Sequence, residues 1–490
     1  MKRAALIAGL AATFASAVAP AADLAIVLQD EVALRPAPRN GSRPNTVLWQ
    51  GETVEVRGER LEYLQVYDYR RERGGYVRAS QVRRVALQPG EAPELLAVLR
   101  FLRDRPGSEA LGIGFAAAYI EAAPAEVLNG PAGTEALDAL GTLAERLARR
   151  ASAGASPKAA QAALSAHLDV AARHGVQFTS YERDGRMRIC YDGMAFRRVL
   201  AMPSTPEQRA RAALALTRPD CISGDLSPAE RRRLDEWRAE VLDKVDEARL
   251  PGILKNRVLM RRAAVWSSLA YQRARQGEDS ASAAERALNA LAGVHKADLT
   301  EADLALYSEA AMRVSASRWA AVAPPKGVPE KGPYIVTVAE ETGETCVLLA
   351  DAKKGPSNPL AKRCTYGLVW TASETLNREG TALALAVQPT ESWREMWIFH
   401  KAKAGWTIRV LPPASTTPNV GYAEFAGWVP GGRQMLVARE AIGGGKQTRT
   451  FELLRLDTLA RVSHAAEPGT LAAFRRWQDP SWKGQTLGLR

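Results

Sequence analysis

The sequence predicts a multidomain α+β protein in which a small β-barrel, a helical array with an inserted β-hairpin and an all-β domain follow one another. Two patterns and the length support this. Apolar and polar residues alternate at period two near both ends of the chain, while apolar residues recur every three or four positions in the middle. A chain of 490 residues is also too long for a single hydrophobic core.

The first residues, 1–21, have the three parts of a secretory signal peptide. A basic start (Lys2, Arg3) precedes an alanine-rich apolar stretch and small residues, which predicts cleavage between Ala21 and Ala22. A retained membrane anchor is the weaker alternative, because the apolar run is short of the roughly 20 strongly apolar residues that a span requires. No later segment reads as a span, so we expect a periplasmic or secreted protein without a transmembrane segment in its mature chain.

The net charge is +12, from 66 Lys and Arg against 54 Asp and Glu. Such a surface favours acidic partners, such as anionic headgroups or the carboxylates of a cell-wall polymer. The alternative is that the excess arginine is spread over solvated faces. Export makes nucleic acid an unsuitable partner despite the charge.

Residues 24–86 are predicted to form short strands that close a small barrel. The runs "VALRPAP", "TVLWQGETVEVRGE", "YLQVYDY" and "GGYVRASQVRRV" alternate apolar with polar residues, and turn residues bound each of them. In the last run we expect Gly74 and Gly75 to permit a tight turn, Tyr76 to cover the barrel end and Val77 to enter the core.

At this point the sequence resembles the bacterial SH3-like domain. The resemblance rests on an opening motif, a central motif and a closing motif, carried by Val32, Leu34, Arg35 and Pro38, by Gly51, Val54 and Val56, and by Gly75, Tyr76 and Val77. It implies a recognition module for peptidoglycan or protein. Tyr63 and Tyr76 stand where the family usually has tryptophan, which alters the aromatic groove.

If this module binds a ligand, aromatic and basic residues near its loops are the expected contacts, since aromatic faces supply area and arginines hydrogen-bond carboxylates. The predicted binding residues are Trp49, Tyr63, Tyr67, Tyr69, Arg70, Arg71 and Tyr76. The alternative hypothesis is that the aromatic residues only pack the barrel.

Residues 91–322 are predicted to be helical, with a β-hairpin over 176–191 whose turn is "RDG". Helix pairs with Ser or Thr caps resemble a tetratricopeptide-type array, although the repeat signature is partial, around Trp266, Leu269 and Ala287. The Pro/Gly/Lys-rich stretch 323–333 is predicted to be a linker.

Residues 334–490 are predicted to form the all-β domain. Two stretches match each other, each with a strand ending at a tryptophan (Trp370, Trp428), a glycine turn and three further strands, and they resemble β-propeller blades. The C-terminal "WQDPSWKGQTLGLR" is predicted to supply the first half of a third unit. Three units are fewer than the four or more blades of usual propellers, so a compact curved β domain is an equal alternative to a closed ring.

The four cysteines agree with export. They allow three connectivities, of which Cys190 with Cys221 and Cys346 with Cys364 is the simplest, because each pair then lies within one predicted domain. Structural zinc sites usually have closely spaced ligands such as C-x-x-C, and the sequence contains none.

No recognised catalytic motif is present, and no cofactor is predicted. "GGGKQT" (443–448) is predicted to be a hairpin turn rather than a phosphate loop. His167 and His174 are seven residues apart on one helix, too far to bind one metal, and are predicted to lie on a solvated surface. Asp243, Asp246 and Glu247 are predicted to form ordinary ion pairs.

Two functional hypotheses remain. The first is a periplasmic binding or scaffold protein of the cell envelope, whose partner is a cell-wall polymer or an envelope protein. The second is a cell-envelope hydrolase whose catalytic residues are not recognisable from sequence. The domain architecture and the missing motifs favour the first.

Overall fold

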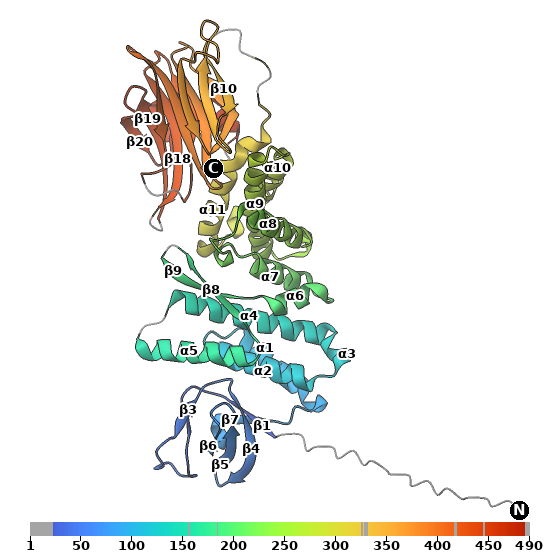
Figure 1. Cartoon of the computed structure of the whole chain (residues 1–490). Helices are drawn as coiled ribbons and strands as arrows, with labels where there is room; N and C mark the ends of the chain where they lie inside the picture. The colour runs from blue at the N-terminus through green and yellow to red at the C-terminus, as the bar shows by residue number, and fades with distance from the viewer. Residues whose placement is uncertain are drawn as a thin grey trace, which may run out of the picture. The chain divides into compact units, whose positions relative to one another are not determined.

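The computed structural model describes residues 23–154, 157–183, 185–324, 327, 332–415, 419–443 and 446–485. The predicted signal peptide and part of the predicted linker lie outside them. Contacts divide the chain into unit 1, Met1–Ser204 with Asp220–Gly224, and unit 2, Thr205–Pro219 with Asp225–Arg490 (Figure 1). None of the helices in the described part of the chain is long and apolar enough to cross a membrane.

Unit 1 begins with the predicted strands. They form a five-stranded antiparallel sheet in the order β6-β5-β4-β1-β7 and a separate pair, β2-β3. The strands are β1 (Leu24–Val27), β2 (Val32–Leu34), β3 (Thr46–Leu48), β4 (Thr53–Arg60), β5 (Tyr63–Asp68), β6 (Arg73–Arg78) and β7 (Val82–Val85). Over the described residues the pairing does not close into a barrel. Its core is mostly valine and leucine, which suits a small pleated sheet.

The Gly-Gly pair lies inside β6, so the prediction of a tight turn at these residues is wrong. Gly75 is buried, and a Cβ there would lie 2.8 Å from the carbonyl oxygen of Arg35. The backbones of Arg35 and Tyr76 exchange two hydrogen bonds of 3.0 and 2.7 Å. Gly75 therefore allows the β2 segment to approach β6 closely. Val77 is fully buried, as predicted.

The rest of unit 1 is mostly helical. Its helices are α1 (Ala92–Arg103), α2 (Glu109–Ala122), α3 (Ala125–Leu128), α4 (Pro131–Ala153), α5 (Lys158–Arg173) and α6 (Met194–Ala201). Leucines and alanines of α1, α2 and α4 share one core with Ile26 of β1 and Val85 of β7, so the sheet and these helices fold together.

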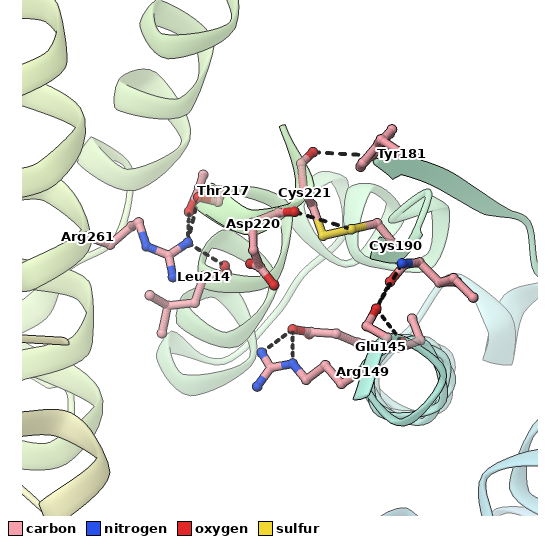
Figure 2. The surroundings of a disulfide bond; sticks show 12 residues. Glu145, Arg149, Tyr181, Cys190, Leu214, Thr217, Asp220, Cys221 and Arg261 are labelled. Atoms are coloured by element: carbon pink, nitrogen blue, oxygen red, sulfur yellow. Dashed lines mark hydrogen bonds and ion pairs between the residues drawn. A yellow bond between two sulfur atoms is a disulfide. The ribbon is translucent and has the colours of Figure 1, made fainter. Parts of the chain in front are cut away.

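The predicted hairpin is present as β8 (Phe178–Arg183) and β9 (Arg186–Tyr191), with Gly185 at positive φ in the turn. Cys190 of β9 bonds Cys221, with their Cα atoms 5.8 Å apart, and the Tyr181 hydroxyl donates to the Cys221 carbonyl at 3.3 Å (Figure 2). The predicted pairing is therefore confirmed, and the bond joins Asp220–Gly224 to the hairpin of the same unit.

The helices of unit 2 are α7 (Pro206–Leu216), α8 (Pro228–Asp243), α9 (Gly252–Arg275), α10 (Ala281–Ala292) and α11 (Glu301–Ser317). The starts of α7 and α8 are capping boxes, in which Thr205 pairs with Gln208 and Ser227 with Glu230. Local sequence thus sets where these two helices begin.

The predicted all-β region follows. β10 (Tyr334–Ala339), β11 (Thr345–Ala350) and β12 (Ala361–Thr365) form one sheet, in which Cys346 and Cys364 face each other and form the second predicted disulfide. Each matching stretch then folds into four consecutive antiparallel strands. The first set is β13 (Leu368–Leu376), β14 (Ala382–Thr390), β15 (Trp393–Ala402) and β16 (Gly405–Leu411), and the second is β17 (Val420–Val429), β18 (Gln434–Gly443), β19 (Lys446–Arg455) and β20 (Arg461–Ala465).

A short parallel contact between β15 and β17 joins the two sets into one eight-stranded sheet. The pairing of Gly443 with Lys446 confirms that "GGGKQT" is a hairpin and no phosphate loop. The C-terminal prediction is wrong over residues 477–485, because the chain forms α12 (Ala472–Trp477) and α13 (Pro480–Gln485) instead of strands, and residues 486–490 of the predicted unit lie outside the described residues. Phe474 and Trp482 of these helices pack on β-sheet residues, including Phe451, and this burial offsets the cost of ordering the short helices.

Candidate binding surface

An exposed group of aromatic and charged side chains lies on the outer face of β4 and β5. Glu55 and Arg57 point outward from β4, and Tyr67 of β5 is the cross-strand partner of Glu55. The Arg57 guanidinium lies 3.9 Å from the ring centre of Tyr67, and the rings of Tyr67 and Tyr69 meet edge to face at 5.0 Å. We call these four residues the tyrosine face.

Hydrogen bonds hold the tyrosine face in place although it is solvated. Glu55 accepts a bond of 2.7 Å from Arg57 and one of 3.1 Å from the Tyr69 hydroxyl. The hydrogen bond from Arg57 is the main cause that lowers the pKa of Glu55, so the carboxylate is ionised at neutral pH. Tyr69 remains 66% exposed. The face therefore offers an aromatic surface with a fixed cation and a fixed anion at its edge.

The loop after β5 places Arg71 against two buried carboxylates. Arg71 donates two bonds of 3.1 Å to Glu52 and one of 2.5 Å to Asp68, while Arg173 of α5 donates to Glu52 at 3.1 Å. Burial lowers the pKa of Arg71, but the hydrogen bonds to Glu52 and Asp68 outweigh it and the net shift is upward. Arg70 lies nearby, 3.4 Å from Asp169. These bonds fix the loop, and a ligand contact by either arginine stays a prediction.

The other three predicted residues lie apart from the tyrosine face. Tyr63 is buried, with its hydroxyl donating to Asn40 at 2.6 Å, as the packing hypothesis expects. Tyr76 is partly buried and its backbone is bonded to that of Arg35. Trp49 is partly buried and lies edge-on to His167, with ring centres 6.4 Å apart.

His167 of α5 is buried and His174, the residue that follows α5, is partly buried, so the prediction that both lie on a solvated surface is wrong. His167 is 3% exposed, and its Nε2 lies 2.8 Å from Asp30 and 3.3 Å from the amide nitrogen of Gln50. His174 Nε2 lies 2.9 Å from the carbonyl oxygen of Gly51. Their spacing of seven does place both on one face of the helix, but the loops that cover this face lie more than 100 residues earlier in the chain.

Asp30 completes this contact between α5 and the sheet loops. Burial raises the pKa of Asp30, but the hydrogen bond and charge of His167 and the bonds from Gln50 outweigh it, and the pKa falls below its usual value. The group therefore attaches α5 to the module that carries the tyrosine face. Sequence spacing gave no signal for Asp30 or for the exposed Arg57.

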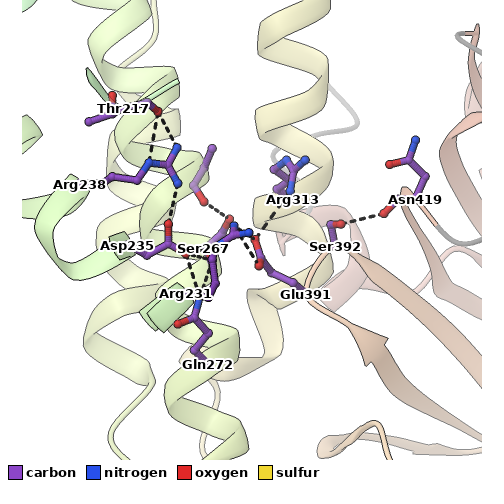
Figure 3. A network of polar contacts seen from close by, with 12 residues as sticks. Thr217, Arg231, Asp235, Arg238, Ser267, Gln272, Arg313, Glu391, Ser392 and Asn419 are labelled. Atoms are coloured by element: carbon purple, nitrogen blue, oxygen red, sulfur yellow. Dashed lines mark hydrogen bonds and ion pairs between the residues drawn. The ribbon is translucent and has the colours of Figure 1, made fainter. Parts of the chain in front are cut away.

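A second polar network lies within unit 2 and is structural in character. Asp235 of α8 is fully buried and accepts bonds from Arg238 at 2.6 Å, Arg231 at 2.8 Å and Ser268 at 2.7 Å (Figure 3). Burial raises the pKa of Asp235, but the two arginines outweigh it and lower the pKa. Arg231 also pairs with Glu391 at 3.3 Å, which joins the helices of this unit to its sheet.

Two of the three carboxylates that were predicted to form ion pairs do so with arginines, and the third caps a backbone N–H group. Asp243 pairs with Arg286 at 3.1 Å and Glu247 with Arg262 at 2.7 Å, whereas Asp246 accepts from the backbone N–H of Ala248.

One group of potential metal ligands gathers in the part of the chain that the structure describes. It comprises Glu340, Glu344, Cys346 and Cys364. Cys346 and Cys364 form a disulfide with each other, so neither has a thiolate that could bind a metal ion. The group therefore gives no positive support for a metal centre in the oxidised protein.

Comparison of the chain with protein-family models, curated proteins and solved structures finds no match.

Proposed function

We propose that this is an exported binding protein of the bacterial cell envelope, in which residues 24–86 act as an SH3-like module that recognises peptidoglycan. The tyrosine face is the observation that carries the proposal. The exposed Tyr69 and the partly exposed Tyr67 are held in position by an arginine and a glutamate, so they provide a stacking surface at little entropic cost. Sugar rings can stack on such a surface, and Arg57 can bind the carboxylates of the attached peptides.

Two further features support the cellular setting of this proposal. The two disulfides are consistent with an oxidising compartment, and the predicted signal peptide directs the chain there. The eight-stranded sheet of unit 2, whose two repeats resemble propeller blades, would serve as a scaffold for an envelope protein partner.

Co-sedimentation of the mature, oxidised protein with purified peptidoglycan tests the proposal. Tyr69→Ala combined with Arg57→Gln should reduce binding about tenfold, since an exposed aromatic and a cation each contribute about 0.5–1 kcal/mol. Tyr366→Ala, at a tyrosine of unit 2 that is 56% exposed, is the matched control and should bind like the wild type.

Binding should also weaken as the salt concentration rises, because exposed charge contacts are screened. Unchanged binding by a double variant that melts like the wild type would remove the tyrosine face as the binding site. Absence of wild-type binding at low salt would refute peptidoglycan as the ligand.

A further inference from the structure

Two carboxylates lie beside the disulfide of unit 2. Cys346 of β11 and Cys364 of β12 are directly opposite each other in the sheet, so their side chains lie on the same face. The turn between β10 and β11 carries Glu340 and Glu344, and the two sulfur atoms and one oxygen of each carboxylate all lie within 4.8 Å of one another. We call these four residues the Cys–Glu cluster.

Backbone hydrogen bonds hold the cluster in place independently of the disulfide. In the turn, the N–H of Glu344 donates to the carbonyl oxygen of Glu341 at 3.0 Å, and the N–H of Glu340 donates to that of Glu344 at 3.4 Å. Residues 345–349 of β11 pair in register with residues 361–365 of β12. The two cysteines should therefore stay opposite each other when the S–S bond is broken.

The carboxylate of Glu344 has no partner in the oxidised protein. Its side chain is partly buried and makes no hydrogen bond or ion pair with any of the described residues. Glu340 pairs with Lys362, but these side chains are 44% and 43% exposed, so water screens the pair and it is easily given up. A partly buried carboxylate without a partner is unfavourable, and a cation bound beside it would relieve that cost.

A thiol reductant turns the cluster into a set of four metal ligands. Cys346 is fully buried, whereas Cys364 lies on the edge strand β12 and is partly exposed, so the thiolate of an external dithiol attacks the sulfur of Cys364. The S–S bond breaks, and Cys346 leaves with the electron pair and takes up a proton. The second thiol of the reductant then releases Cys364 as a thiol. The protein gains two electrons and two protons, and the dithiol becomes a disulfide.

The ligand types of the reduced cluster favour zinc. Thiolate sulfur binds Zn²⁺ at about 2.3 Å and carboxylate oxygen at about 2.0–2.2 Å, so tetrahedral ligand atoms lie about 3–4 Å from one another. The ligand atoms of the cluster need only small shifts to reach such distances. Ca²⁺ and Mg²⁺ prefer oxygen ligands alone, whereas thiolates select zinc. Each thiol releases its proton as the metal binds.

We propose that reduction of this disulfide creates a zinc site in unit 2, whose ligands are the two thiolates and the carboxylates of Glu340 and Glu344. In an oxidising compartment the cysteines remain a disulfide, so the site forms only when a thiol reductant reaches the protein. The cluster thus alternates between a covalent bond and a metal centre. The site is separate from the tyrosine face and does not depend on the proposed function.

Zinc titration of the full mature chain tests the site. The protein is reduced with a phosphine, which is converted to its oxide, and after anaerobic desalting it is titrated with Zn²⁺ against a chromophoric chelator. The reduced wild type should bind one zinc ion per chain, and the oxidised protein none with comparable affinity. Cys346→Ser combined with Cys364→Ser should abolish binding. Cys190→Ser combined with Cys221→Ser removes the disulfide of unit 1 and is the matched control, which should still bind one zinc ion.

The carboxylates are tested by single variants of the reduced protein. Glu344→Gln should weaken zinc binding by about tenfold or more, because even the loss of a residue that only supports a metal ligand costs about 10–100-fold. Glu341→Gln is the matched control, since Glu341 lies in the same turn but accepts a bond from the Tyr366 hydroxyl and is outside the cluster. Cobalt(II) provides a readout that needs no variant, and it should give thiolate-to-cobalt charge transfer and the visible bands of a tetrahedral ion.

Three results would overturn the proposal. The first is equal zinc affinity of the reduced wild type and of the variant that lacks Cys346 and Cys364. The second is unchanged affinity in both Glu340→Gln and Glu344→Gln, which would mean that the thiolates bind zinc without the carboxylates. The third is loss of the native circular-dichroism spectrum when the wild type is reduced, because the site requires the pairing of β11 with β12 to persist.

Discussion

Glu374 should make the stability of unit 2 depend on pH around neutrality. It lies on β13, is partly buried, and accepts a hydrogen bond of 3.2 Å from the backbone N–H of Ile335 on β10. Burial raises the pKa of Glu374 from 4.5 to about 7. The neutral carboxyl therefore fits its folded surroundings better than the carboxylate does. The conservative perturbation is Glu374→Gln, which keeps an acceptor for Ile335 and cannot ionise.

The sign and size follow from this pKa. Below pH 4.5 the carboxyl of Glu374 is neutral in both the folded and the unfolded protein, and its contribution to the free energy of unfolding is fully present. This contribution is lost as the pH rises through about 7, the pKa in the folded protein. At 1.36 kcal/mol per pH unit the full loss is about 3 kcal/mol. Because water still reaches part of the side chain, we expect the free energy of unfolding to fall by only about 2 kcal/mol.

Urea unfolding of the oxidised protein from pH 4.5 to pH 8.5 measures the effect. Of the 11 tryptophans only Trp49 lies in unit 1, so tryptophan fluorescence reports mainly on unit 2. The Gln variant should match the wild type at pH 4.5 and exceed its free energy of unfolding by about 2 kcal/mol at pH 8.5. Glu379→Gln, at an exposed carboxylate of the same unit, controls for the loss of one charge. A constant difference between the Gln variant and the wild type across this range would refute the reasoning.

Three further predictions concern stability and covalent structure. Asp235→Ala should lower the free energy of unfolding of unit 2 by about 4 kcal/mol, because Arg238 is left buried and without a carboxylate, whereas Asp243→Ala should cost less than about 1 kcal/mol in the same urea titration. Gly51→Ala should destabilise unit 1 by about 3 kcal/mol in circular-dichroism melts, since Gly51 has φ +84° and its Cβ would lie 2.2 Å from the carbonyl oxygen of Ala110. Gly41→Ala meets nothing within 4 Å and should change stability by less than about 0.5 kcal/mol, so an equal loss in both variants would contradict this explanation. Mass spectrometry of the protein purified without reductant should find no free thiol, and a mass higher by four hydrogen atoms than the oxidised value would contradict both disulfides.

Features with a local physical cause could be predicted from the sequence. Helix starts such as Thr205 and Ser227 are set by capping residues a few positions apart, and the hairpin at Gly185 by a short turn. Four cysteines allow three connectivities, and the simplest of them, which pairs sequence neighbours, is the one that the structure shows. Helix α2 lies within the region predicted to be helical, although it is apolar on nearly all sides and shows no helical periodicity of its own.

The candidate surface could be predicted only in part. Tyr67 and Tyr69 were proposed from residue type, and the structure places both on one exposed face. Arg57 was missed because its relation to Tyr67 depends on the register of β4 against β5. The sequence cannot reveal which aromatic residue is exposed, so Tyr63, which is buried against Asn40, looked equivalent to Tyr69.

By itself, the sequence determined the order of β, α and β regions, the matching four-stranded repeats and the hairpin, because periodicity and turn residues act over a few positions. Only the tertiary structure decided that the helices fall into two units, that His167 is buried against Asp30, that α12 and α13 are helices, and that Arg394 and Arg318 share Glu424. These features depend on contacts between segments far apart in the chain. Side chains such as His167 become buried and find their ion-pair partners only when those segments pack together, and no local sequence pattern indicates which segments will pack.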